Sequence, residues 1–301
     1  MDRHRPALAI LVSVFVSAGC GGAATGGSPA SGAVAASPGA AATTQSAMPT
    51  ATPKPTPTPR PTIPAGSLSL VGLGDSIPGA LGCDPPCRSY VEVYGELASA
   101  ALGKPVVVEN LATNDGLESR GLRDRVTHDT EHRAALADAD LITITIGNND
   151  WQGPCSWIDH ARCLAHGTAQ VDASLSAILD EIATLRKGKP TAIRVTTLYD
   201  MYLGDPGAAA AWGFPPTEAG VATFHAEFLA ALKDFNAMTC RVATSHGAVC
   251  VDLVPAFNGP KDTKDAGPLL GPDHVHPSQA GQDAIAHALE GSGFATLGSA
   301  P

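Results

Sequence analysis

Long hydrophobic runs and excess positive charge are both missing from this sequence. No apolar run reaches the roughly 18 to 20 residues that a membrane-spanning helix needs, which excludes a polytopic membrane protein. Lys and Arg number 19 against 29 Asp and Glu, a formal net charge of −10, which argues against a nucleic-acid partner. Only 16% of residues are charged and 44% are hydrophobic, so most of the chain is expected to fold around one sizeable core.

The first residues have the features of an export signal. Arg3 and Arg5 precede a short apolar stretch over 7–18, and small residues lead to Cys20. The segment Ser-Ala-Gly-Cys at 17–20 resembles the lipobox of bacterial lipoproteins, with Ser where an aliphatic residue is preferred. It predicts a signal peptide over 1–19 and a membrane anchor through acylation of Cys20. A plain secreted protein is the alternative.

A linker is expected over 20–64. This segment consists mainly of Gly, Ala, Ser, Thr and Pro and has too few large apolar residues to offset its own ordering entropy. From Pro53 to Pro61 every second residue is proline, which favours extended polyproline II geometry. The segment is interpreted as a spacer that holds a catalytic domain away from a membrane or as a passive secreted linker.

Six further cysteines predict disulfide bonds in an exported chain. Their spacing suggests three local pairs in chain order, Cys83–Cys87, Cys155–Cys163 and Cys240–Cys250. Each closes a short loop, worth about 2 to 3 kcal/mol in the chain-entropy model. A zinc site is the weaker alternative, because structural zinc usually draws on two close-set cysteine pairs and only the first pair is so close.

From residue 65 to residue 297, short apolar runs alternate with longer helical patterns. The strand candidates are rich in Val, Ile and Leu on both faces, as in a buried parallel sheet: 68–73, 105–109, 141–146, 192–198 and 248–253. The helix candidates are 90–101, 169–185, 219–245 and 279–289. This order predicts one three-layer α/β domain, whose ligands would bind beyond the carboxyl ends of the strands.

Polar residues suited to nucleophilic catalysis follow the first and third strands and precede the last helix. Ser76 directly follows the first strand, where an exposed hydroxyl can act as a nucleophile; a helix N-cap is the alternative. Asn149 is placed to donate to an oxyanion or to form an Asx-turn. Asp273 precedes His276 by three residues, which suits a general base and its orienting acid. A surface loop is the alternative, and a metal pair of His274 and His276 lacks a third ligand nearby.

These segments together resemble the SGNH hydrolases, also called the GDSL esterases and lipases. Gly-Asp-Ser-Ile at 74–77 matches the first block of the family with Ile for Leu, Gly-Asn-Asn-Asp at 147–150 matches the GxND block, and 273–276 matches the DxxH block. The second block is imperfect. After an Asn-Leu-Ala segment, Asp115 falls where glycine is expected, and Gly116 follows one residue later.

The resemblance implies a flavodoxin-like α/β/α fold with five parallel strands, and no metal or organic cofactor. Ser76 would attack the ester carbonyl, His276 would remove its proton, and Asp273 would hold the imidazole. The oxyanion would be bound by the N–H groups of Ser76 and Gly116 and by the Asn149 side chain; a neighbouring N–H is the alternative to Gly116. The three cystine pairs also resemble those of secreted actinobacterial members of the family.

Substrate contacts are expected from residues near the same edge of the sheet. Trp151 and Trp157 are candidates to wall an acyl or sugar pocket, with packing as the more common role of such residues. The loop 204–216 is a candidate apolar flap, or simply leads into a helix. Three residues at the end of the fourth strand are candidate selectivity residues: Tyr199, Asp200 and Tyr202.

The sequence therefore predicts an extracytoplasmic serine esterase or lipase, expected to be a monomer and to act on small-molecule, lipid or polysaccharide esters. A polysaccharide O-acetyl esterase or an acyltransferase would use the same site. A tethered binding protein that has lost catalysis is the third hypothesis, and nothing favours it because the triad positions are all filled.

Overall fold

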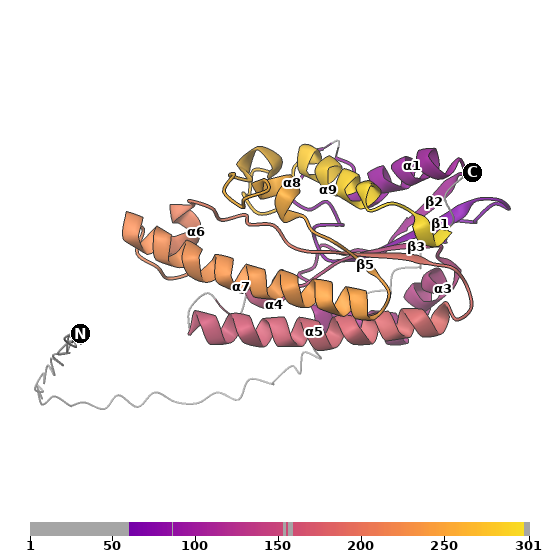
Figure 1. The fold of residues 1–301 in the computed structure, drawn as a ribbon, viewed down its shortest axis with the longest axis horizontal. Helices are drawn as coiled ribbons and strands as arrows, with labels where there is room; N and C mark the ends of the chain where they lie inside the picture. The colour runs from indigo at the N-terminus through magenta and orange to yellow at the C-terminus, as the bar shows by residue number, and fades with distance from the viewer. Residues whose placement is uncertain (1–59, 86, 153–154, 156–158, 298–301) are drawn as a thin grey trace, which may run out of the picture. The chain divides into compact units, whose positions relative to one another are not determined.

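Five apolar segments form one parallel sheet in the order β2-β1-β3-β4-β5 (Figure 1). The computed structural model describes residues 60–85, 87–152, 155 and 159–297. The strands are β1 (Leu68–Gly74), β2 (Val106–Asn110), β3 (Leu141–Thr145), β4 (Ala192–Thr196) and β5 (Val249–Val251). This order confirms the predicted flavodoxin-like fold. The predicted signal peptide, Cys20, nearly all of the predicted linker and Trp157 lie outside the described residues.

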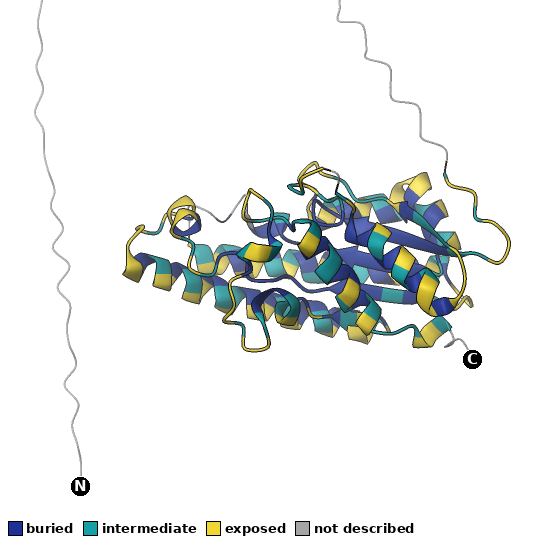
Figure 2. Ribbon diagram, turned by 90° about the horizontal axis from the view of Figure 1, so that it is seen from above, coloured by how far each residue is buried: buried dark blue, intermediate teal, exposed yellow. Residues whose placement is uncertain are grey.

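The centre of the sheet is buried on both faces. All five residues of β3 and six of the seven residues of β1 are buried, and Figure 2 shows these strands inside the molecule. Parallel strands that carry helices on both faces need apolar side chains on both, which is why they read as continuous Val, Ile and Leu runs. The sheet therefore brings the residues that follow β1 and β3 to one edge.

Helices cover both faces of the sheet (Figure 1). The first face carries α1 (Tyr90–Leu102), α8 (Val254–Asn258) and α9 (Gln279–Gly291). The second carries α2 (Ser119–His128), α3 (Thr130–Asp138), α5 (His160–Leu185) and α7 (Glu218–Ser245). The short elements are α4 (Asn149–Gln152), α6 (Pro206–Ala211) and the 3₁₀ turns η1 (Gly267–Leu269) and η2 (Ala295–Leu297). The result is the three-layer arrangement that the sequence predicts.

The crossover between β2 and β3 differs from the expectation, because it contains two helices that the sequence analysis missed. Helix α2 is strongly polar, and Leu122 and Val126, one turn apart, are its buried large apolar residues. Asp129 then ends α2 and caps α3, since its carboxylate accepts hydrogen bonds from the backbone N–H groups of Glu131 and His132. Two short helices with few apolar residues leave a weaker periodic signal than one long helix.

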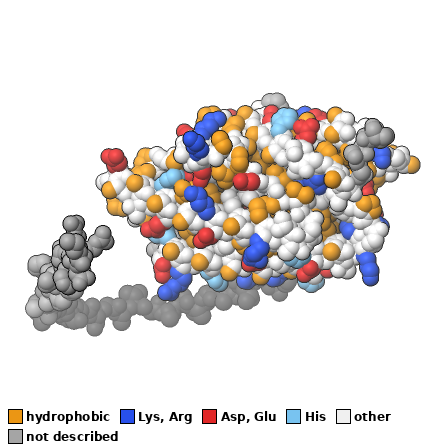
Figure 3. Space-filling view, viewed as in Figure 1, with side chains coloured by type: hydrophobic (Ala, Val, Ile, Leu, Met, Phe, Trp, Pro, Cys, Tyr) orange, Lys and Arg blue, Asp and Glu red, His pale blue; other side chains and the backbone are white. Residues whose placement is uncertain are grey.

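Three disulfide bonds close the predicted local loops, Cys83–Cys87, Cys155–Cys163 and Cys240–Cys250. The zinc alternative is therefore wrong for these cysteines. Near the end of the predicted linker, the Arg60 guanidinium lies 3.0 Å from the carboxylate of Glu109 on β2. Within the described part of the chain, no helix combines the length and apolarity needed to cross a membrane. On the face seen in Figure 3, acidic and basic side chains are interspersed with apolar ones.

Candidate active site

Ser76 lies at the carboxyl edge of the sheet, two residues after β1 ends. The preceding carboxylate of Asp75 accepts a hydrogen bond from the backbone N–H of Ile77 (3.2 Å), which folds the chain into a turn. The Ser76 carbonyl oxygen accepts from the N–H of Leu81 (3.0 Å). The N-cap interpretation of Ser76 is wrong, because α1 begins at residue 90 and Ser89 is its N-cap.

The side chains of Ser76, His276 and Asp273 form one chain of contacts across 200 residues of sequence. The Nε2 atom of His276 lies 2.8 Å from the Ser76 hydroxyl, and its Nδ1 atom lies 2.6 Å from Oδ2 of Asp273. His276 is 15% exposed and Asp273 is 40% exposed. Both ring nitrogens of His276 therefore have a partner. The Asp273 carboxylate orients the imidazole through Nδ1, and Nε2 faces the Ser76 hydroxyl.

The Asp273 carboxylate also organises its own loop. Its Oδ1 atom accepts hydrogen bonds from the backbone N–H groups of Val275 (3.0 Å) and His276 (2.9 Å). Partial burial would raise the pKa of Asp273, but these bonds and the contact with the His276 ring outweigh it and hold the pKa below its usual value. The carboxylate therefore stays charged, the state that best orients an imidazole.

A loop from the other end of the domain packs against this carboxylate. Gly82 has a φ of +71°, and a Cβ atom there would lie 2.4 Å from Oδ2 of Asp273 and 2.9 Å from Cβ of His276. Only glycine combines this conformation with so close an approach. The neighbouring Cys83–Cys87 disulfide closes the same loop. The turn that follows Ser76 therefore also supports the histidine loop.

Asn149 lies next to the segment that carries Ser76. Its Nδ2 atom donates to the backbone carbonyl of Leu117 (3.0 Å) and lies 3.4 Å from Oδ2 of Asp75. Gly116, the residue before Leu117, has a φ of +74°. Within the described part of the chain, no protein group accepts a hydrogen bond from the N–H of Ser76 or of Gly116. The segments that carry Ser76, Gly116 and Asn149 therefore meet at this edge.

Two buried carboxylates lie behind the site. Asp75 is fully buried; burial raises its pKa to about 7, the N–H of Ile77 opposes the shift, and the nearby Asp150 carboxylate adds to it. Burial also raises the pKa of Asp150, although Ser119 donates to its carboxylate through N–H (3.0 Å) and hydroxyl (2.7 Å) and Gln170 donates through its amide (2.8 Å). Asp150 belongs to the GxND segment, but its anchoring of α2 was not predicted.

The described tryptophans and the selectivity candidates pack into the interior instead. Trp151 is 1% exposed and makes edge contacts with Phe228 and Phe235. Trp212, in the expected flap, is 5% exposed and lies against Phe228 too. The selectivity candidates at the end of β4 are also buried: Tyr199, Asp200 and Tyr202. Their aromatic and carboxylate groups therefore stabilise the loops around the site rather than form an open pocket wall.

Another histidine–carboxylate contact, with a buried carboxylate, was not predicted from the sequence. Nε2 of His225 on α7 lies 2.6 Å from Oδ2 of Asp200, which is 1% exposed. His225 also lines a concavity of about 450 Å³ with apolar residues that include Val221. No local sequence pattern predicts this contact, because the two residues are 25 positions apart and lie on different elements.

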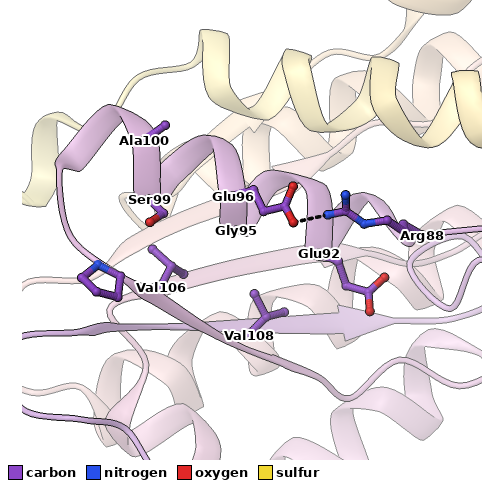
Figure 4. A pocket seen from close by; sticks show the side chains of 9 residues that line it. Arg88, Glu92, Gly95, Glu96, Ser99, Ala100, Val106 and Val108 are labelled. Carbon is purple, nitrogen blue, oxygen red and sulfur yellow. Dashed lines mark ion pairs between the residues drawn. The ribbon is translucent and has the colours of Figure 1, made fainter.

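Away from Ser76, the described part of the chain contains a concavity beside α1 but no cluster of metal ligands. In the described residues, no group of three or more His, Cys, Asp or Glu side chains is placed to hold a metal ion. The concavity in Figure 4, about 610 Å³, lies between α1 and the edge strand β2, and no triad residue lines it. The Arg88 guanidinium, which lines this concavity, forms an ion pair with Glu96 at 2.7 Å.

Residues 73–284 match the GDSL-like lipase/acylhydrolase family. The chain belongs to this family. The protein is therefore a carboxylic ester hydrolase. No curated protein matches the chain.

Solved structures with the same fold are esterases and lipases of low sequence identity. The lipase Lip_vut3 from a goat rumen metagenome has a TM-score of 0.59 at 18% identity and covers 76% of this chain and 98% of its own. An extracellular lipase from Streptomyces rimosus has a TM-score of 0.53 at 21% identity, covering 75% and 100%. A variant of Axe2, an acetyl-xylooligosaccharide esterase from Geobacillus stearothermophilus, has a TM-score of 0.52 at 23% identity, covering 76% and 96%. At this identity the similarity supports the fold alone.

Proposed function

We propose that this family member hydrolyses esters through an acyl-enzyme intermediate on Ser76. The Ser76 oxygen attacks the carbonyl carbon while His276 Nε2 takes the hydroxyl proton. When the ester C–O bond breaks, the same proton passes to the alcohol oxygen, which leaves. Water then attacks the acyl-serine, gives a proton to Nε2, and releases the acid as Ser76 regains that proton. The observation that carries the proposal is the 2.8 Å and 2.6 Å contact chain that ends at Asp273.

The negative charge that develops on the substrate oxygen needs donors close to Ser76. We assign this role to the backbone N–H groups of Ser76 and Gly116 and to Nδ2 of Asn149. In support, the two N–H groups have no protein acceptor within the described residues. The contact of Asn149 with the Leu117 carbonyl brings this amide beside the Gly116 loop, and its second contact, with Asp75, is longer at 3.4 Å. To bind the oxyanion, the amide exchanges one of these two acceptors for the substrate oxygen.

An extracytoplasmic location fits the three disulfide bonds, which form and persist in oxidising compartments. The export signal and the acylation of Cys20 are part of the same proposal. An enzyme tethered in this way would meet its ester substrates at the cell surface.

The test is replacement of the nucleophile. Ser76→Ala should reduce hydrolysis of p-nitrophenyl acetate by at least about 10³-fold and abolish covalent labelling by a fluorophosphonate, without a change in far-UV circular dichroism. Ser99→Ala, a matched change on α1, should retain full activity and labelling. A folded Ser76→Ala protein that keeps the wild-type rate would refute the assignment. Acetylated xylan and esters of graded acyl length, assayed in parallel, would define the substrate class.

A further inference from the structure

The loop that carries His276 is held mainly by its own polar groups. Its two ends are joined by a bridge between Leu270 and Pro277, and the Gly271 N–H donates to the His276 carbonyl (2.7 Å). His274 has a φ of +57°, which is unfavourable for a residue other than glycine. A hydrogen bond from outside the loop adds to these internal bonds in keeping this conformation.

One hydrogen bond from outside the loop falls on the peptide group between Val275 and His276. The N–H of this peptide donates to Asp273 Oδ1 (2.9 Å), and its carbonyl oxygen accepts from the Tyr199 hydroxyl (2.8 Å). The peptide plane is therefore fixed from both sides. Because this plane determines the direction in which the His276 side chain leaves the backbone, it also determines where Nε2 lies relative to Ser76.

Tyr199 is itself held rigidly. Its side chain is fully buried and stacks on Phe257 of α8, with ring centroids 3.9 Å apart and an interplanar angle of 6°. The next residue, Asp200, donates its N–H to the Asn258 side chain (2.9 Å) and accepts from the Asn258 amide through its carbonyl (2.7 Å). Burial raises the pKa of Tyr199 well above its usual value, so the hydroxyl keeps its proton and remains a donor.

We propose that Tyr199 is a positioning residue for the catalytic histidine: its hydroxyl fixes the Val275–His276 peptide and so aims the imidazole at Ser76. The proposal rests on the proposed function, since it gives His276 the role of base. It replaces the expected role of Tyr199 in substrate selectivity, because a fully buried ring cannot contact substrate. Its consequence is kinetic: loss of the hydroxyl slows proton transfer and leaves substrate binding unchanged.

The first experiment is Tyr199→Phe, assayed with p-nitrophenyl acetate. The expected result is a kcat about 10-fold lower with KM within about 2-fold of wild type, the scale of one lost neutral hydrogen bond. Tyr94→Phe is the matched control. Tyr94, on α1, is also fully buried and stacks on Phe294, but its hydroxyl has no hydrogen-bond partner in the described residues. This control should keep the wild-type kcat.

A double-mutant cycle separates positioning from a general effect on the structure. In a His276→Ala background, Tyr199→Phe should cause no further loss, because the hydroxyl acts only through the imidazole. Phe257→Leu, which keeps the hydroxyl but removes the stacking partner, should lower kcat less and should also have no effect in the His276→Ala background. It provides a second test should Tyr199→Phe fold poorly.

The outcomes distinguish the two proposals. If His276→Ala retains the wild-type rate, the proposed function fails. If His276→Ala is inactive while folded Tyr199→Phe keeps its full kcat, only the positioning role fails. Equal losses from Tyr199→Phe in both backgrounds, or a change confined to KM, would also overturn the positioning role.

Discussion

Removal of the buried charge at Asp75 should change how the stability of the protein depends on pH. The folded-state pKa of Asp75 is about 7, raised from 3.8 mainly by complete burial. The folded protein therefore binds a proton here more tightly than the unfolded chain does. The resulting stability is fully present below about pH 4 and is lost as the pH rises towards 7, after which the effect is constant.

The size of this effect follows from the difference between the two pKa values. A pKa difference of about three units corresponds to a loss of ~4 kcal/mol in the free energy of unfolding over the full pH range. About 2 to 3 kcal/mol of this loss falls between pH 5 and pH 8. Asp75→Asn removes the titration. The variant loses a hydrogen-bond acceptor facing Asn149, which costs about 1 kcal/mol at any pH. The free energy of unfolding of the wild type minus that of the variant should therefore fall by about 2 to 3 kcal/mol between pH 5 and pH 8.

The assay is urea unfolding of the disulfide-intact protein at four or five pH values, analysed by linear extrapolation. Asp150 is present in both proteins, so its contribution largely cancels in the difference. Asp115→Asn is the control: its carboxylate is 60% exposed, and hydrogen bonds from Thr113 and Arg125 hold its pKa below the usual value despite slight desolvation. The difference in unfolding free energy between the wild type and Asp115→Asn should therefore be constant between pH 5 and pH 8. A constant difference for Asp75→Asn as well would refute the reasoning about burial.

Two further substitutions test the geometry of the site. Gly82→Ala should lower kcat by about 10²-fold, because the new Cβ displaces the Asp273 carboxylate. Gly103→Ala is the control: Gly103 is also in the left-handed conformation (φ +63°) but has open space around it, so this change should lower stability without loss of kcat. Equal kcat values for these two variants would contradict the contact. Asn149→Ala should lower kcat by about 10² to 10³-fold if its amide binds the oxyanion, and a loss below about 3-fold would leave it only the role of bonding the Leu117 carbonyl.

The sheet could be predicted from the sequence because its burial is visible in local composition. A strand covered on both faces shows an unbroken apolar run, as in β3, and each of the five runs lies at a predicted position. Helices α2 and α3 lacked this signal. Their outer faces are charged, so the pair Leu122 and Val126 is a short stretch of the 3.6-residue pattern.

The supporting contacts of the site could not be predicted because they join distant segments. Gly82 meets Asp273 only when the first and last loops of the domain pack together. Tyr199 looked accessible because it follows a strand at the ligand-binding edge, yet the stacking of Phe257 and the carbonyl of Val275 cover it. Burial of an aromatic side chain at a loop depends on which elements pack over it, and no local pattern encodes that.

The departure in the second block shows how a local change can be compatible with the site. Asp115 stands where the family resemblance expects glycine, but the left-handed residue of the loop is Gly116, so no strained aspartate is needed. The Asp115 carboxylate instead accepts hydrogen bonds from Thr113 (2.6 Å) and from Arg125 on α2 (3.0 Å). These bonds fix the loop to α2, which Asp150 in turn anchors behind the site through Ser119. Side-chain contacts to α2 thus hold in place a loop that a glycine alone would leave with greater conformational freedom, and the GxND segment secures the same helix.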